Sequence, residues 1–230
     1  MPPKNLNRVA KRAAATSKTR SIRSSSSNSK TTAPAQAVLE AGAAKMAPKT
    51  TTTATSSNDA APPPGPVYFW RPHDHNGYLG QWYSSEFTHE GCTYATAEMW
   101  MMVGKARLFG DEEVASMMLA TTDPKTHKKL GREVRGFDEK VWNLNRLRIV
   151  EEGNYLKFTI SAEADALRKM LLETGDRELV EASPMDRIWG VGLGEKNAGK
   201  NRHRWGLNLL GKALMNVRGR LREEEGVKEG

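Results

Sequence analysis

The chain of 230 residues contains no aromatic residue before Tyr68. Everything before that point is rich in Ser, Thr, Ala, Pro and Lys, and it includes the low-complexity run SIRSSSSNSKTTAPAQ. A segment of this kind cannot bury enough apolar surface to offset the entropy lost on ordering. We therefore predict a disordered tail over residues 1–66, which ends in the stiff, proline-rich APPPGP, and a folded domain over residues 67–230.

The net charge of +8 lies entirely in the predicted tail. Residues 1–66 hold ten Lys and Arg against Glu40 and Asp59, which leaves 25 basic and 25 acidic residues in 67–230. A basic tail of this composition suits a nucleic-acid or nuclear tether, a mitochondrial transit peptide, or a solvated tail without a specific role. We expect a cytoplasmic or nuclear location, with mitochondria as the alternative, and we expect any contact of the tail to be with nucleic acid rather than membrane.

Neither a disulfide nor a metal site is expected. Cys92 is the single cysteine, which excludes an internal disulfide and fits a reducing compartment. The composition around His73, Asp74, His75 and His89 suggests metal ligands, but the spacing matches no zinc pattern. We therefore expect no metal and no cofactor.

The pattern of caps, turns and apolar residues predicts a helix-dominated α+β domain with a small β component. Aspartates placed before helical patterns are expected N-caps, and Gly175 is expected to end a helix with a left-handed cap. Strands are predicted in VYFW (67–70), on both sides of the turn in EFTHEGCTY (86–94) and in RELVEAS (177–183). Helices are predicted over 95–108, over 112–119 after Asp111, from Pro124 towards Leu130 after Asp123, after Asp138, over 162–173 after Ser161, and over 209–221 after Asn208. Residues 184–201 are predicted to form a glycine-bearing loop.

The first predicted helix places charges inside an apolar stripe. At 100° per residue, Met101, Met102 and Lys105 lie within about 60° of Glu98 around the helix axis. One interpretation is an ion pair between Glu98 and Lys105 at the edge of a methionine-rich core. The other is the wall of a substrate cleft, in which burial shifts the pKa of a carboxyl group towards acid–base work. The spacing alone leaves both open.

A second acidic group lies in LVEASPMDRIWGVGLG, where Glu181 and Asp186 flank a turn and Trp189 and Gly190 follow. These could be solvated acids at the exit of a strand. However, carboxyl groups beside a tryptophan are also typical of sites that cleave sugars, because one group handles the proton while the aromatic face stacks on a ring. The glycines here match neither a P-loop nor a dinucleotide fingerprint, although their backbone N–H groups could approach a phosphate.

Six segments in order resemble the NADAR family, the group of YbiA-like N-glycosidases. They are SSEF, GCTYATAEMWMMVGKARLFGD, DPKTHKKLGREVRGFDEKVWNLNR, YLKF, LLETGDRELVEASPMDRIWGVGLG and WGLNLLGKALMNVR. Together they extend over about Tyr68 to Leu221. The resemblance implies a single YbiA-like domain. One departure is Met99, which stands where the family usually has histidine.

The resemblance also implies a set of site residues. Its catalytic members are Glu98, Lys105 and Asp186. Its substrate-binding members are Trp142, Lys157, Glu181, Trp189, Gly190 and Asn208. In this assignment the two tryptophans stack on base or ribose and Lys157 meets a phosphate. Lys105 either holds a phosphate or tunes Glu98, or it attacks ribose C1 to give a Schiff base.

The activity implied by the resemblance is hydrolysis of the bond between a base nitrogen and ribose C1. Two substrate classes are associated with the family: ADP-ribose on guanine in nucleic acid, and the ribosylamino-pyrimidine phosphates of riboflavin synthesis. The alternative is a non-catalytic module that binds ADP-ribose or NAD. A third interpretation is an interaction protein that acts through its basic tail and carries an inert domain.

Overall fold

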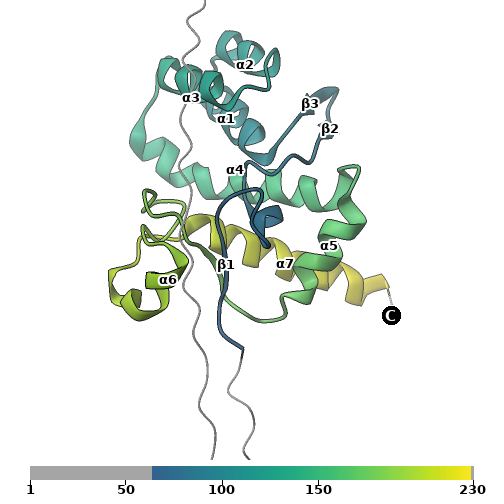
Figure 1. Cartoon of the computed structure of the whole chain (residues 1–230). Coiled ribbons are helices and arrows are strands. Elements are labelled where there is room, and N and C mark those ends of the chain that lie inside the picture. The colour runs from purple at the N-terminus through teal and green to yellow at the C-terminus, as the bar shows by residue number, and fades with distance from the viewer. Residues whose placement is uncertain (1–63, 229–230) are drawn as a thin grey trace, which may run out of the picture. The chain divides into compact units, whose positions relative to one another are not determined.

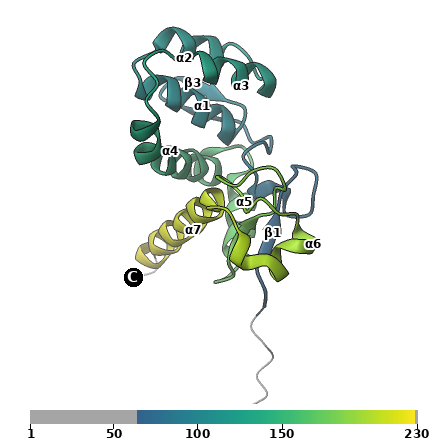
Figure 2. The same cartoon turned by 90° about the vertical axis from the view of Figure 1, so that its left-hand side faces the viewer.

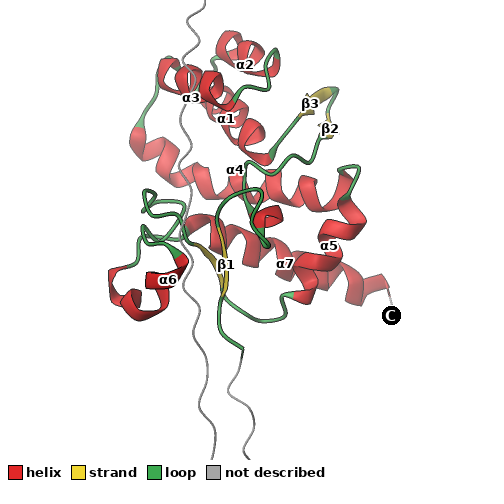
Figure 3. Cartoon of the chain, viewed as in Figure 1, coloured by secondary structure: helices red, strands yellow, loops and turns green. Residues whose placement is uncertain are grey.

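The computed structural model describes residues 64–228 (Figure 1). The predicted tail, apart from its last three residues, lies outside the described residues. In the described part most residues are helical, and the strands are few and short (Figure 3). The predicted helix-dominated α+β fold with a small β component is confirmed.

The elements follow the order that the sequence predicts. The helices are α1 (Ala97–Leu108), α2 (Glu112–Leu119), α3 (Pro124–Glu133), α4 (Glu139–Ile160), α5 (Ala164–Glu173), α6 (Glu195–Ala198) and α7 (Leu209–Lys228), with 3-10 turns η1 (Gly77–Leu79) and η2 (Gly199–Arg204). The strands are β1 (Val67–Phe69), β2 (Phe87–His89), β3 (Cys92–Tyr94) and β4 (Leu179–Glu181). None of the helices in the described part combines the length and the apolar character needed to cross a membrane.

The predicted aspartate caps are confirmed. Asp111 accepts a hydrogen bond from the N–H of the third residue of α2, Asp138 does the same for α4, and Asp123 caps α3 with Pro124 at its first position. The prediction that Ser161 starts a helix is wrong, because its hydroxyl donates to the carbonyl of Lys157 at the end of α4. Residues 184–201 were expected to be a loop throughout, but α6 and the start of η2 lie within them.

Helix α4 occupies the centre of the domain. In both Figures 1 and 2 it passes between α1–α3 on one side and α7 on the other, and α5 follows it at one end. The largest fully buried side chains come from all of these layers; they include Met99, Met118, Phe158, Leu171, Leu214 and Leu221. The methionine-rich face of α1 therefore packs into the same core as α4 and α7.

A parallel pairing of β1 with β4 connects the start of the domain with a segment far along the chain. Val67 lies opposite Leu179 and Phe69 lies opposite Glu181. The N–H of Ala182 also donates to the carbonyl of Phe69 at 2.8 Å, so the pairing continues past the strand. This ladder fixes the position of Glu181, the last residue of β4.

Candidate active site

Helix α1 presents Glu98 at its N-terminal end. The side chain of Thr96 caps the helix by accepting from the N–H of Met99, and the N–H of Glu98 donates to the carbonyl of Gln81 at 3.1 Å. The Glu98 side chain is buried, with 7% of the residue exposed. Burial raises the pKa of its carboxyl group to about 7, although the positive charge of Lys128 on α3 acts in the opposite direction.

Strand β4 presents Glu181, whose backbone is fixed on both sides. Its N–H donates to Oδ1 of Asn208 at 3.1 Å, and its carbonyl accepts from the N–H of Val191 at 2.9 Å. Its Oε2 is buried and has no hydrogen-bond partner among the described residues. Burial raises the pKa of Glu181 to about 8, and the nearby charges of Asp186 and Glu98 act in the same direction. Glu98 and Asp186 therefore both lie close enough for their charges to act on Glu181, and we call the three residues the carboxyl cluster.

Asp186 lies in the turn that follows β4. Its Oδ1 accepts hydrogen bonds from the N–H groups of Ile188 and Trp189, both at 2.8 Å, which holds the carboxyl group in one orientation. Gly190 allows this turn to approach the strand, because a Cβ at that position would lie 2.7 Å from the carbonyl oxygen of Glu181. The two acidic groups that the sequence suggested separately thus form one site.

Lys105 does not pair with Glu98. Its Nζ donates to the carbonyl of Gly131 at 2.6 Å and lies 4.2 Å from the centre of the Phe137 ring and 5.9 Å from that of Trp142. Within residues 64–228, no carboxylate lies within ion-pair distance of Lys105, and no basic side chain lies within that distance of Glu98. The ion-pair interpretation is therefore wrong. Burial lowers the pKa of Lys105.

Lys157 is fully buried, and this position does not support the phosphate contact implied by the resemblance. Its Nζ donates to the carbonyl groups of Tyr78 and Gly80, and burial lowers its pKa to about 7. Both carbonyls belong to the η1 turn and the residue that ends it. The carbonyl of the next residue, Gln81, accepts a hydrogen bond from the N–H of Glu98. Lys157 therefore holds the loop to which Glu98 is hydrogen-bonded.

Asn208 also has a different role from the one expected. Helix α7 begins at the next residue, and the Asn208 carbonyl accepts the N–H of Lys212, as a residue at the cap position does. Its side chain does not cap the helix: Oδ1 accepts from the N–H of Glu181, and Nδ2 donates to the carbonyl of Leu179 at 2.9 Å. Asn208 therefore fixes β4, and through it Glu181, instead of facing a ligand.

Replacing Asn208 by alanine is expected to lower the free energy of unfolding by about 2–4 kcal/mol, because two buried backbone groups of β4 lose their partners and alanine is strained at the φ of 50°. Asn208→Gly avoids the strain but still loses the two hydrogen bonds, so its free energy of unfolding should lie between those of the wild type and Asn208→Ala. The exposed Asn216 on the same helix is the control, and Asn216→Ala should change stability by less than about 0.5 kcal/mol. Urea titration measures all three, and equal stability of the alanine variants would contradict the role of Asn208.

The two tryptophans of the predicted site are half-buried. Trp142, in the first turn of α4, and Trp189, beside Asp186, both pack against the core and leave part of each ring exposed. Sequence reasoning missed Gln81, whose carbonyl accepts the N–H of Glu98, and Lys128, whose positive charge acts on the Glu98 carboxyl group. The predicted helix beginning at Pro124 covers Lys128, but nothing local indicates that its charge acts on Glu98.

The side chains considered as metal ligands lie in two places, with His73, Asp74 and His75 before η1 and His89 opposite Cys92 on β2 and β3. His73 and His75 are exposed, and the Sγ of Cys92 accepts from Arg107 at 3.6 Å. Among the residues that the structure describes, no three His, Cys, Asp or Glu side chains are grouped so that they could hold a metal ion.

Comparison with known proteins identifies the family. Residues 68–222 match the NADAR domain. The chain is 41% identical to N-glycosidase R617 of Acanthamoeba polyphaga mimivirus over 147 residues. The aligned region covers 61% of this chain and 85% of that protein. It is 29% identical to riboflavin biosynthesis protein VVA0006 of Vibrio vulnificus over 161 residues. This aligned region covers 69% of this chain and 39% of that protein. The NMR structure of Escherichia coli YbiA superposes with a TM-score of 0.55 at 25% identity, covering 70% of this chain and 87% of that one. The chain therefore belongs to the NADAR domain family and is an enzyme of the N-glycosidase class.

Proposed function

We propose that the enzyme hydrolyses the bond between a base nitrogen and ribose C1 in a base that carries ADP-ribose within nucleic acid. The observation that carries this proposal is the carboxyl cluster, in which the pKa of Glu98 is raised to about 7 and that of Glu181 to about 8. Groups whose pKa lies near the working pH can both give and accept a proton, as cleavage of a glycosidic bond requires.

Glu181 is assigned as the general acid. With a pKa of about 8 it is mostly protonated at neutral pH. Its buried Oε2 has no hydrogen-bond partner in the described part of the chain, so no protein group competes for its proton. The family resemblance implies a substrate-binding role for Glu181, whereas its burial favours a catalytic role.

Glu98 is assigned as the general base. Its carboxylate accepts a proton from water as the water oxygen bonds to C1, while the C1–N bond breaks and the base nitrogen takes the proton of Glu181. The products are the unmodified base, which remains in the nucleic acid, and ADP-ribose with a hydroxyl on C1. Asp186, held by two backbone N–H groups, orients the water, and the negative charge of the cluster stabilises the positive charge that develops on the sugar.

The remainder of the substrate is expected to lie along α1 towards Lys105. Glu98 and Lys105 are seven residues apart, which is about 10 Å along a helix. That length accommodates a ribose and its neighbouring group. Trp142 and Phe137 beside Lys105 supply aromatic faces, and the amine supplies a hydrogen-bond donor at the far end.

Lys105 allows a second route, because burial lowers its pKa and thereby favours the nucleophilic amine. In this route the amine attacks C1 of the ring-opened sugar and expels the base nitrogen, and water then hydrolyses the lysine imine to restore Lys105. Borohydride added during turnover should trap the sugar on Lys105, as peptide mass mapping would show. The fully buried Lys157 is the internal control and should carry no adduct. A complete lack of adduct on Lys105 would limit this residue to binding.

A second candidate substrate is a free ribosylamino-pyrimidine phosphate, which the name of the Vibrio vulnificus relative favours. The purified full chain should be offered this compound and an oligonucleotide with ADP-ribosylated guanine, and the products should be identified by mass spectrometry. Release of ADP-ribose is the expected result. Release of ribose 5-phosphate alone would assign the enzyme to the metabolite. Binding of ADP-ribose with no release of product from either compound would contradict the proposed hydrolysis.

A further inference from the structure

The segment that carries Asp186 exposes apolar side chains next to the carboxyl cluster. Met185, which directly precedes Asp186, is 92% exposed, and Ile188 and Leu207 are 46% and 48% exposed. Single exposed apolar residues are ordinary on protein surfaces, but three on one segment beside a catalytic site indicate a surface that meets a partner.

This surface is rigid. The carbonyl of Arg187 accepts the N–H of Leu207 at 2.8 Å, and the carbonyl of Ile188 accepts the N–H of Leu209 at 3.1 Å. The N–H of Gly206 also donates to the carbonyl of Val191, at 2.9 Å. The two halves of the segment 184–207 are therefore bonded to each other, so Met185 extends from a fixed turn.

The same surface is basic, although residues 67–230 have no net charge. Six exposed Lys and Arg side chains lie between residues 184 and 212, against the two acidic residues Asp186 and Glu195; the six are Arg187, Lys196, Lys200, Arg202, Arg204 and Lys212. Arg202 is paired with Glu178. On another side of the cluster, Lys128 acts on Glu98. Basic groups thus flank the acidic site on two sides, which favours a substrate with several phosphates.

We propose that the segment 184–207 binds the single-stranded nucleic acid that carries the modified base, with Met185 inserted beside that base and the basic side chains on the phosphates. This inference rests on the proposed function. A modified base within a stack cannot bring its bond to ADP-ribose to the buried Glu98, and enzymes that act on a base take it out of the stack. An exposed apolar side chain can fill the space that the base leaves, and apolar contact with a neighbouring base is independent of sequence. A free nucleotide requires neither feature.

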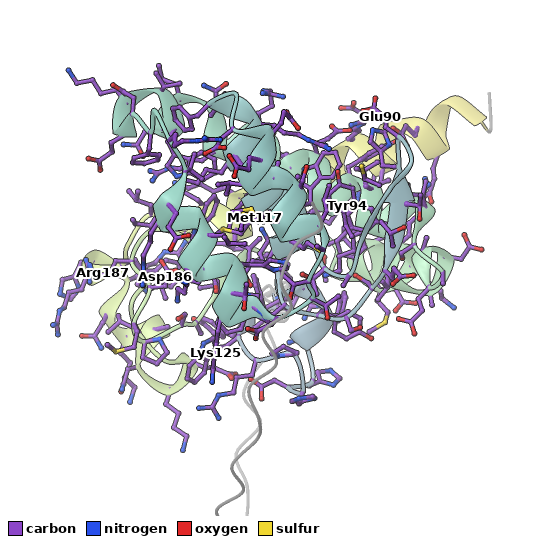
Figure 4. All side chains as sticks on the ribbon, turned by 90° about the horizontal axis from the view of Figure 1, so that it is seen from above. Glu90, Tyr94, Met117, Lys125, Asp186 and Arg187 are labelled. Atoms are coloured by element: carbon purple, nitrogen blue, oxygen red, sulfur yellow. The ribbon has the colours of Figure 1, made fainter. Side chains whose placement is uncertain are left out.

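The position of the segment fits this arrangement. Figure 4 shows Asp186 and Arg187 side by side at one edge of the domain, with the Arg187 side chain directed outwards. Its Nη2 donates to the carbonyl of Arg204 at 3.1 Å, which joins the turn at Asp186 to the basic η2. A single-stranded nucleic acid bound along this edge would have its phosphates on η2 and its modified base at the carboxyl cluster.

The first test compares one reaction in two substrates, ADP-ribosylated guanine within an oligonucleotide and the same modified guanosine as a free nucleoside. In the full chain, Met185→Ala should lower kcat/KM for the oligonucleotide at least tenfold and change the value for the nucleoside less than twofold. Met117→Ala is the control, because Met117 is 51% exposed on α2, and it should change neither value. An equal decrease of kcat/KM on both substrates would mean that Met185 only supports Asp186. No decrease on either substrate would mean that Met185 does not contact the nucleic acid.

The second test does not depend on turnover. Fluorescence anisotropy should measure the affinity of the full chain for a labelled single-stranded DNA with no modified base. Replacing Arg187, Lys200 and Arg204 together by alanine should weaken binding at least tenfold and reduce the slope of log affinity against log salt by about two to three. The tail is the same in both proteins, so its contribution cancels. Unchanged affinity would overturn the proposed surface, whereas loss of affinity without hydrolysis of either substrate would preserve it and reject the proposed function.

Discussion

Replacing Glu98 by glutamine is expected to reduce kcat/KM at least about a hundredfold, which is the usual contribution of a positioned general base. The amide has nearly the same shape as the acid, but it cannot accept a proton at the pH where the Glu98 carboxyl group titrates, about 7. The backbone contact with Gln81 does not involve the side chain, so α1 should keep its position. A steady-state assay on the oligonucleotide substrate measures the loss.

The control for this variant is Glu90→Gln, in the turn between β2 and β3. Glu90 is exposed, and in Figure 4 it lies on the other side of the domain from Asp186. This variant should retain wild-type activity, and both variants should retain the wild-type circular dichroism spectrum. Full activity of a correctly folded Glu98→Gln enzyme would remove Glu98 from the mechanism and leave Asp186 as the base.

Glu181 is expected to make both activity and stability depend on pH. Its pKa is raised to about 8 in the folded protein, from an ordinary value of 4.5. Between these values the folded state binds more protons than the unfolded state, so the free energy of unfolding should fall as the pH rises. The stabilisation is complete below pH 4.5 and is lost by the time the pH passes about 8. We expect a decrease on the order of 2 kcal/mol between pH 5 and 8, since each pKa unit corresponds to about 1.4 kcal/mol and the coupled groups share the effect.

Glu181→Gln should make this decrease smaller and leave the part that comes from the raised pKa of Glu98, and it should reduce kcat/KM at least about a hundredfold, because the general acid is lost. Urea titrations at pH 5, 6, 7 and 8 measure the stability, with the exposed Glu195→Gln as the control. In the wild type, kcat/KM should fall below about pH 7, as Glu98 takes up a proton, and above about pH 8, as Glu181 loses one. The same dependence of stability on pH in wild type and Glu181→Gln would contradict the assignment of the buried acid.

Local patterns in the sequence determined most of the helices. Asp111, Asp123 and Asp138 each bond to a backbone N–H two or three residues ahead, so their effect is visible within one turn of sequence. The turn at Glu90-Gly91 is local in the same way, since both residues have positive φ. The helices α6 and η2 escaped prediction because they are short and lie among glycines.

The site was predicted in part. The periodicity of α1 placed Glu98 and Lys105 on one face, and the turn after β4 placed Asp186 near Trp189. The roles of Lys157 and Asn208 could not be read in this way, because a lysine and an asparagine look the same in a sequence whether they face a ligand or a buried carbonyl. In the structure, their partners lie 77–79 and 27–29 residues away.

The sequence by itself determined which residues can do the chemistry, and the tertiary structure decided which of them do it together. Helix caps and periodicity act over a few residues, so they are written in the local sequence. The carboxyl cluster depends instead on the pairing of β1 with β4, which joins residues 67–69 to residues 179–181, and on the packing of α1 and α3 against each other. Burial by these distant segments raises the pKa of Glu98 and Glu181, and no local pattern specifies it.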